Sequence, residues 1–128
     1  CAEFRRDYSE PPGNEAAKRT AQSGEKPQAV FAANDMMALG CLYAFNEAGV
    51  RVPQDVALAG FDDIPLARFV HPTLTTMRVS IAELGGQAMS RLLEAIESDG
   101  ARVAPSAMLT PELIVRASSV GEGRHATS

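Results

Sequence analysis

The chain has 128 residues, of which 45% are hydrophobic and 22% are charged, a composition typical of one globular unit and unlike that of a disordered or fibrous chain. The net charge is −4 and no basic run is longer than Arg5-Arg6, so this stretch alone is not expected to bind the phosphates of nucleic acid. Two cysteines make no disulfide framework, and no stretch approaches the roughly 18 apolar residues of a membrane span, so we expect a cytoplasmic protein without a membrane partner. Because the chain opens with Cys-Ala-Glu and shows neither a start methionine nor a signal peptide, we expect a piece of a longer protein.

The first half of the chain alternates between helical and extended patterns. The extended runs are short and apolar, and turn residues flank them, which suits strands buried on both faces. In chain order we predict a helix over 14–22, a strand over 28–33, a helix from Asn34-Asp35 to about Ala48 with Gly49 after it, and a strand over 56–61. This order predicts an α/β fold, a parallel sheet with flanking helices in which ligands meet the carboxyl ends of the strands.

The second half adds a strand, a helix and a final strand. Residues 74–79 have β-branched character, and Ser80 with Glu83 predicts a capping box for a helix that reaches about residue 97. A last strand is predicted over 107–118, where Pro111 indicates an edge or a bend. We expect residues 120–128 to form a disordered tail.

The helix after Asn34 has apolar residues on two sides. Met36, Leu39 and Tyr43 form one stripe, and Cys41 belongs to the other. In so small a domain one side is expected to pack on the sheet, which leaves the other for a second chain. The alternative is a central helix buried on all sides.

Asp62 follows the second strand directly, at the place where ligands bind in parallel α/β sheets. A carboxylate there can accept two hydrogen bonds from adjacent hydroxyls of a sugar or ribose, and the alternative is a role in the turn or as a cap. Because neighbouring side chains of a strand point opposite ways, Asp62 and Asp63 are not expected to form a catalytic pair. We expect Asp63 to cap or turn the following loop.

Asn34 closes the first strand, and its amide offers donors and an acceptor to the same edge of the sheet. Its alternative role is the N-cap of the helix that begins at Asp35. The lone His71 has no partner at metal-ligand spacing, and Cys41 has no arrangement of His and acid around it, so both are expected to be structural or surface residues. The residues therefore predict no catalytic group, no metal and no cofactor.

Six blocks of the sequence are familiar in their order and spacing. They are Ala-Val-Phe-Ala-Ala-Asn-Asp-Met-Met-Ala-Leu-Gly at 29–40, Glu-Ala-Gly-Val-Arg-Val-Pro-Gln-Asp-Val at 47–56, Gly-Phe-Asp-Asp at 60–63, Pro-Thr-Leu-Thr-Thr at 72–76, Glu-Leu-Gly at 83–85 and Leu-Thr-Pro-Glu-Leu-Ile-Val-Arg at 109–116. Together they strongly resemble the lac repressor / galactose repressor (LacI/GalR) family of bacterial transcription regulators. The resemblance covers about residues 7–119 and corresponds to the last third of such a regulator.

This resemblance implies a helix-turn-helix outside the present sequence and a two-lobed sensing domain like a periplasmic sugar-binding protein, with the effector between the lobes. Residues 1–73 would belong to the C-terminal lobe, residues 74–104 would supply a strand and a helix of the N-terminal lobe, and residues 105–119 would return as a strand to the C-terminal lobe. The helix near 80–97 would then carry an apolar stripe with no lobe present to bury it.

The resemblance also assigns candidate residues. Asp62 would hold effector hydroxyls, Asn34 would contact effector as the aligned asparagine does in some members, and Tyr8 would stack on the flat face of a sugar or base. The family places the helix after Asn34 and the loop after Asp63 against their twofold mates. By position, the dimer interface would contain Met36, Leu39, Tyr43 and Phe69.

These expectations favour the ligand-sensing and dimerisation portion of a DNA-binding transcription regulator. Its partners would be a small effector such as a sugar or nucleoside, a second copy of the chain, and operator DNA only through the absent N-terminal domain. The alternative is the periplasmic sugar-binding protein of an ABC transporter, which shares the two-lobed fold. An enzyme that uses Asp62 is disfavoured because the sequence supplies no second catalytic group.

Overall fold

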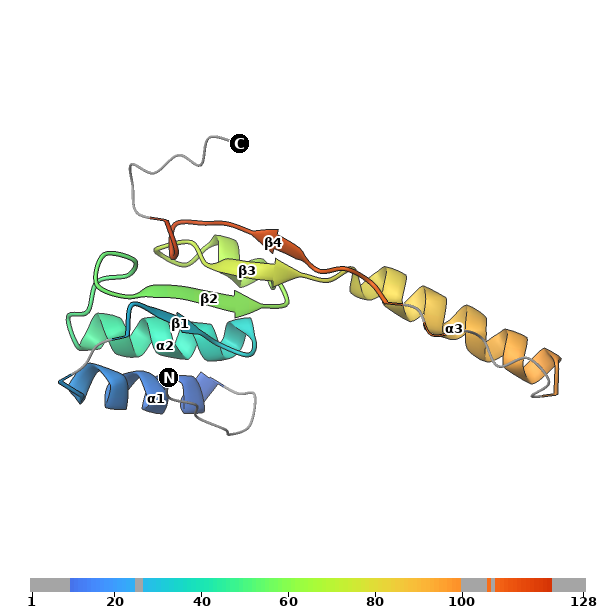
Figure 1. The fold of residues 1–128 in the computed structure, drawn as a ribbon, viewed down its shortest axis with the longest axis horizontal. Helices are drawn as coiled ribbons and strands as arrows, with labels where there is room; N and C mark the ends of the chain where they lie inside the picture. Colours follow the sequence, from blue (N-terminus) through green and yellow to red (C-terminus); the bar gives the residue numbers. More distant parts are fainter. Residues whose placement is uncertain (1–9, 25–26, 100–105, 107, 121–128) are drawn as a thin grey trace. The chain divides into compact units, whose positions relative to one another are not determined.

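The computed structural model describes residues 10–24, 27–99, 106 and 108–120, with the elements labelled in Figure 1. The chain divides into two compact units, of which one contains Cys1–Arg78 and Leu113–Ser128 and the other contains Val79–Glu112. The elements in chain order are α1 (Glu10–Gln22), β1 (Ala29–Phe31), α2 (Asp35–Glu47), β2 (Ala57–Phe61), the 3-10 helix η1 (Pro65–Arg68), β3 (Thr75–Arg78), α3 (Ile81–Glu97) and β4 (Glu112–Ile114). The tail expected over 120–128 lies outside the described residues beyond Val120.

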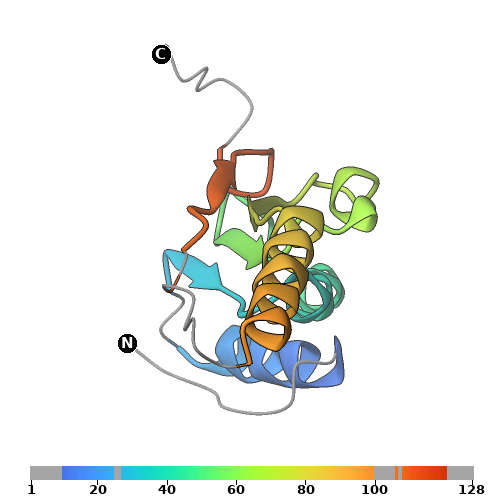
Figure 2. The same ribbon diagram turned by 90° about the vertical axis from the view of Figure 1, so that its right-hand side faces the viewer.

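The strands form one sheet in the order β1-β2-β3-β4. β1 pairs with β2 and β2 with β3 in parallel, with Val30 opposite Leu58 and Gly60 opposite Thr76. The predicted α/β class with a parallel sheet and flanking helices is confirmed. Because parallel strands end on the same side, the residues after β1 and β2 come to one edge of the sheet, the edge that Figure 2 faces.

β2 is an inner strand of the sheet, and its residues alternate strictly between buried and half-buried. Leu58 and Gly60 are buried, and the residues between them are half-buried. β1 differs from the expectation of burial on both faces, because Ala29 and Phe31 are exposed and Phe31 keeps 66% of its surface accessible. The reason is its place at the edge of the sheet, where only β2 lies beside it.

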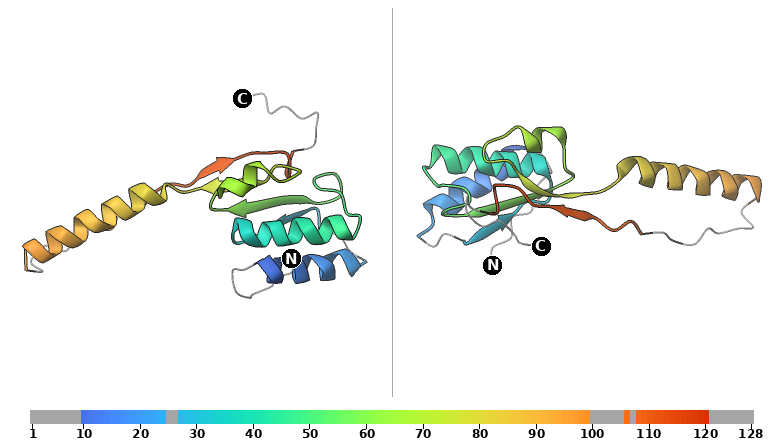
Figure 3. Two further views of the ribbon diagram at one scale, coloured as in Figure 1. Left: turned by 180° about the vertical axis from the view of Figure 1, so that it is seen from behind. Right: turned by 90° about the horizontal axis from the view of Figure 1, so that it is seen from above.

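Helix α2 lies between α1 and β2 (Figures 1 and 3), and its buried residues form the core of the first unit. Outside α2, the core includes Leu58 and Leu74. At the tightest contact with α1, the Cys41 thiol donates to the Gly13 carbonyl over 3.2 Å, and a Cβ on Gly13 would clash with the backbone of α2. α1 begins at Glu10, earlier than the predicted residue 14, because the first turn of a helix tolerates proline.

Helix α3 forms the second unit with its flanking residues, and none of its residues is buried. Its exposed large apolar residues are Ile81, Leu84, Met89, Leu92, Leu93 and Ile96. The expected capping box is wrong, because Ser80 adopts φ −74° and ψ 85° and its side chain caps no helical amide. No helix among the described residues combines the length and apolar character needed to cross a membrane.

The strand expected to lie in the N-terminal lobe instead pairs with β2 as β3 and ends the first unit at Arg78. Its two threonines explain this placement. Thr75 and Thr76 are buried and bond Ser118 and Asp35, which both belong to the first unit. β4 covers only Glu112–Ile114 of the strand predicted over 107–118.

Candidate functional site

The carboxyl ends of β1 and β2 bring Asn34, Asp35, Asp62 and Asp63 to one edge of the sheet. β1 ends at Phe31, three residues before Asn34, and β2 ends at Phe61, directly before the two aspartates. Phe61 pairs with Met77 of β3, so the loop after β2 also lies beside the end of β3. This edge is the candidate site, and its carboxylates have sharply different surroundings.

The Asp62 side chain is exposed. Its backbone amide donates to the Met77 carbonyl over 2.9 Å, and its backbone has φ 107°, a conformation that residues other than glycine rarely adopt. Its carboxylate makes no hydrogen bond or ion pair with any residue that the structure describes. Both carboxylate oxygens are therefore accessible for hydrogen bonds to a ligand.

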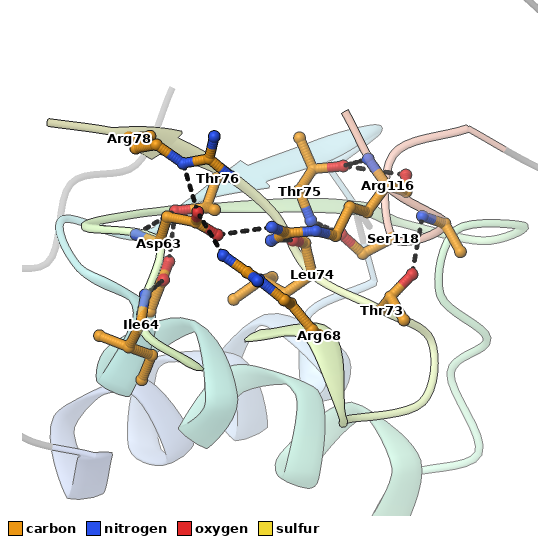
Figure 4. A network of polar contacts seen from close by, with 12 residues as sticks. Asp63, Ile64, Arg68, Thr73, Leu74, Thr75, Thr76, Arg78, Arg116 and Ser118 are labelled. Carbon is orange, nitrogen blue, oxygen red and sulfur yellow. Dashed lines mark hydrogen bonds and ion pairs between the residues drawn. The ribbon is translucent and has the colours of Figure 1, made fainter. Parts of the chain in front are cut away.

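Asp63 points the other way, into a cluster of arginines (Figure 4). Its side chain is only 2% exposed, and its carboxylate is 2.5 Å from Arg116, 2.7 Å from Arg78 and 3.6 Å from Arg68. Burial alone would raise the pKa of the Asp63 carboxyl. The hydrogen bonds and charges of Arg116 and Arg78 outweigh burial and hold this pKa below its ordinary value, so the carboxylate is ionised at neutral pH.

Asp35 is fully buried at the first turn of α2. Its two oxygens accept from the Thr76 hydroxyl over 2.6 Å and from the Ile64 amide over 2.9 Å. Burial raises the pKa of Asp35, the two hydrogen bonds act against this, and repulsion from Asp62 and Asp63 adds to the rise. Asp35 thus connects α2 to β3 and to the loop that follows β2, and each of its oxygens already accepts a hydrogen bond.

Asn34 is the N-cap of α2, as the alternative reading of its role predicts. Its side-chain oxygen accepts from the Met37 amide over 2.9 Å, and its backbone is extended. The side chain of Asn34 thus takes part in the helix cap, and a contact with a ligand would be additional to this bond. Gly49, after α2, has φ 69°, the left-handed conformation that glycine favours after the end of a helix.

The remaining candidate residues differ in how exposed they are. Tyr8 lies outside the described residues. Met36, Tyr43 and Phe69 are exposed, by 44%, 57% and 80%, and Leu39 is half-buried. Cys41 is buried, which raises the pKa of its thiol to about 11, so this thiol is protonated at neutral pH and is a poor nucleophile.

Sequence reasoning missed the arginines around Asp63. Arg116 is 53 residues away along the chain, and no local pattern links the two. The signal that could have found them is the placement of Arg78 and Arg116 at the ends of predicted strands, where a sheet can bring them to the Asp63 edge.

A separate hollow of about 380 Å³ lies in the first unit, away from these carboxylates. It is lined by residues of the C-terminal turn of α2, the turn before β2 and the segment before β3, with Asn46, Arg51, Gln54 and His71 among them. Neither Asn34 nor Asp62 lines it. We place the candidate site at the Asp62 edge because the accessible carboxylate is there and the hollow offers no comparable group.

Comparison with known proteins identifies relatives of this chain. Residues 1–119 match the profile of the family described as periplasmic binding protein-like domain. The HTH-type transcriptional repressor PurR of Haemophilus influenzae is 44% identical over 108 residues, which are 83% of this chain and 32% of that protein. The chain therefore spans about a third of the length of the curated relatives it matches.

Solved structures agree. A protein from Sanguibacter keddieii described as a LacI-family transcriptional regulator is 37% identical with a TM-score of 0.82, covering 88% of this chain and 43% of that one. The lac repressor dimer bound to operator and the anti-inducer ONPF is 32% identical with a TM-score of 0.80, and the match covers 89% of this chain and 39% of that one. These relatives are transcription regulators, which favours a regulator over the binding protein of a transporter.

Proposed function

The chain belongs to the periplasmic-binding-protein-like domains of the LacI/GalR regulator family, and from this premise we propose that it is the effector-sensing and dimerisation portion of a longer DNA-binding transcription regulator. The observation that carries the proposal is the contrast among the three carboxylates. Asp35 and Asp63 are buried and fully engaged, whereas Asp62, at the carboxyl end of β2, is exposed and has no protein partner among the described residues.

The proposed effector carries adjacent hydroxyl groups, as sugars and nucleosides do. The two oxygens of one carboxylate can accept from two neighbouring hydroxyls at once, which fixes the orientation of the ligand. Asn34 would contact the effector through its amide group, and Tyr8 would supply the stacking surface that the family resemblance implies. The protein would act in the cytoplasm as a switch controlled by ligand binding, without catalysing a reaction.

The switch requires two arrangements of the sensing domain that bind the effector with different affinities. In the proposed layout, residues 1–73 and 105–119 belong to one lobe and the helix within 74–104 to the other, with β3 now assigned to the first. Operator DNA would be bound only by a helix-turn-helix outside this sequence. The effector would then alter operator affinity by favouring one arrangement.

Dimerisation is proposed through the exposed apolar face of α2 and the segment around η1. Met36, Leu39 and Tyr43 follow one another at helical spacing on α2, and Phe69 follows η1. Exposed apolar residues grouped in this way suit a twofold contact between copies.

A thermal-shift measurement on the full-length protein tests the ligand assignment. Sucrose, D-glucose, D-ribose and adenosine are added separately to the wild type, to Asp62→Ala and to Glu47→Ala, which removes an exposed acid at the other end of α2. A ligand at a hundredfold excess over its Kd stabilises the folded state by about 2.7 kcal/mol, enough for a clear shift.

We expect at least one of these compounds to raise the melting temperature of the wild type and of Glu47→Ala, and not that of Asp62→Ala. An equal shift in Asp62→Ala contradicts the assignment of Asp62. No shift with any of the compounds contradicts the proposed effector class.

A further inference from the structure

We propose that Asp63 is the positioning residue of the effector site: its buried carboxylate, held by arginines of β3 and of the segment after β4, fixes the loop after β2 so that Asp62 faces outward. This inference rests on the proposed function and assigns to the second aspartate a role beyond the cap or turn expected from its sequence.

The loop needs such a support because its backbone is strained. Asp62 has φ 107° and Asp63 has φ 49°, so two consecutive residues with side chains adopt conformations that glycine favours. Such conformations persist only where the surrounding structure holds them in place. This pair of conformations places the Asp63 side chain inside while the Asp62 side chain is exposed.

Hydrogen bonds fix the backbone of the loop at three successive amides. The Asp62 amide donates to the Met77 carbonyl over 2.9 Å, the Asp63 amide to the Thr76 hydroxyl over 3.3 Å, and the Ile64 amide to Asp35 over 2.9 Å. Two of these acceptors belong to β3 and one to α2. The amide bonds hold the loop against its neighbours, but they do not by themselves decide which aspartate is buried.

The ionic contacts of Asp63 favour the arrangement in which Asp63 is the buried aspartate. Its carboxylate is 2% exposed, and the Arg116 side chain that bonds it is only 13% exposed. An ionised pair buried to this extent resists loss of either partner, because the remaining charge would lack compensation. Turning the Asp63 side chain outward would therefore break its contacts with both Arg116 and Arg78.

The same contacts connect the loop to the two segments at which the chain leaves the first unit and returns to it. β3 ends with Arg78, after which the chain enters the second unit, and the chain returns at Leu113, three residues before Arg116. Arg116 is itself fastened to β3, because its guanidinium donates to the Leu74 carbonyl over 2.8 Å and its amide to the Thr75 hydroxyl over 2.8 Å. Asp63 thus links the ligand-facing loop to the segments through which the two units are connected.

The test uses the full-length protein and the variants Asp63→Asn, Asp63→Asn/Arg116→Gln and Arg78→Gln. The matched control is Asp55→Asn, which breaks the ion pair between Asp55 and Arg51, 2.7 Å apart before the other end of β2. Hydrogen exchange of the amides of residues 62–64 measures how well the loop is protected, and the melting temperature measures the stability of the fold. Calorimetric titration with sucrose, D-glucose, D-ribose and adenosine measures ligand affinity.

We expect Asp63→Asn to speed exchange at residues 62–64 and to weaken binding of the active probe by roughly tenfold, whereas Asp55→Asn changes neither. The double variant also removes Arg116, the buried guanidinium that Asp63→Asn leaves without a carboxylate, so it should recover melting temperature without recovering loop protection or affinity. Loss of binding with recovered stability is the signature of positioning, because a merely structural role would recover both together.

Two results overturn the inference: wild-type exchange at residues 62–64 in Asp63→Asn, or recovery of stability, protection and affinity together in the double variant. If Asp63→Asn does not fold, Arg78→Gln decides, since Arg78 is partly exposed and its loss should speed loop exchange to a smaller degree. If the wild type binds none of the probes, the proposed effector class fails, and the exchange measurements still decide the role of Asp63.

Discussion

Gly60 is the residue at which β2 passes the buried carboxylate of Asp35. A Cβ at this position would approach the Asp35 oxygen and the Ala38 side chain more closely than packed atoms allow. Gly60→Ala must therefore displace Asp35 from its bonds to Thr76 and Ile64. We expect the free energy of unfolding to fall by about 1–3 kcal/mol, measured by urea denaturation.

The matched control at the residue scale is Gly24→Ala, because a Cβ on Gly24 would meet no atom within 4 Å. Its unfolding free energy should stay within about 0.5 kcal/mol of the wild-type value. Equal stability of the two variants would mean that β2 and Asp35 can move apart at little cost, which contradicts the close packing described above.

At the scale of the element, the stability of α2 depends on its N-cap residue, Asn34. The Asn34 side chain accepts from the Met37 amide, so Asn34→Ala should lower the free energy of unfolding by about 1 kcal/mol. Asn34→Asp keeps an acceptor and adds a negative charge near the N-terminus of the helix, so it should keep the stability. Urea denaturation of both variants checks this, and equal losses would show that the cap contributes nothing.

The elements that the sequence predicted well are those whose boundaries depend on local chemistry. Asn34 as N-cap and Gly49 after the helix set the two limits of α2, and each can be recognised from its own residue type and its neighbours in the sequence. The exposed edge of β1 and the pairing of β3 with β2 depend on neighbours far along the chain. The Asp63 cluster is the extreme case, because Arg116 reaches it only through the order of the sheet.

At the scale of the whole molecule, the unexplained feature of the first unit is its apolar surface. One side of α2 is buried against β2 and α1 through Ala38, Cys41 and Phe45. Tyr43 on the same helix and Phe69 after η1 remain exposed by 57% and 80%. An apolar face that the chain itself leaves uncovered favours association, and large aromatic residues contribute strongly to the binding free energy of such contacts.

The dimer proposal can be tested by replacing these aromatic residues singly in the full-length protein. Tyr43→Asp and Phe69→Asp each place a charge in the proposed contact, so each should weaken dimerisation by at least about 2 kcal/mol, or roughly thirtyfold in the dissociation constant. Tyr43→Phe and Phe69→Leu keep apolar side chains and should remain dimeric. Sedimentation equilibrium measures the constants, and circular dichroism checks that each variant is folded. A folded Asp variant that dimerises as tightly as its conservative control would place the interface on another face of the molecule.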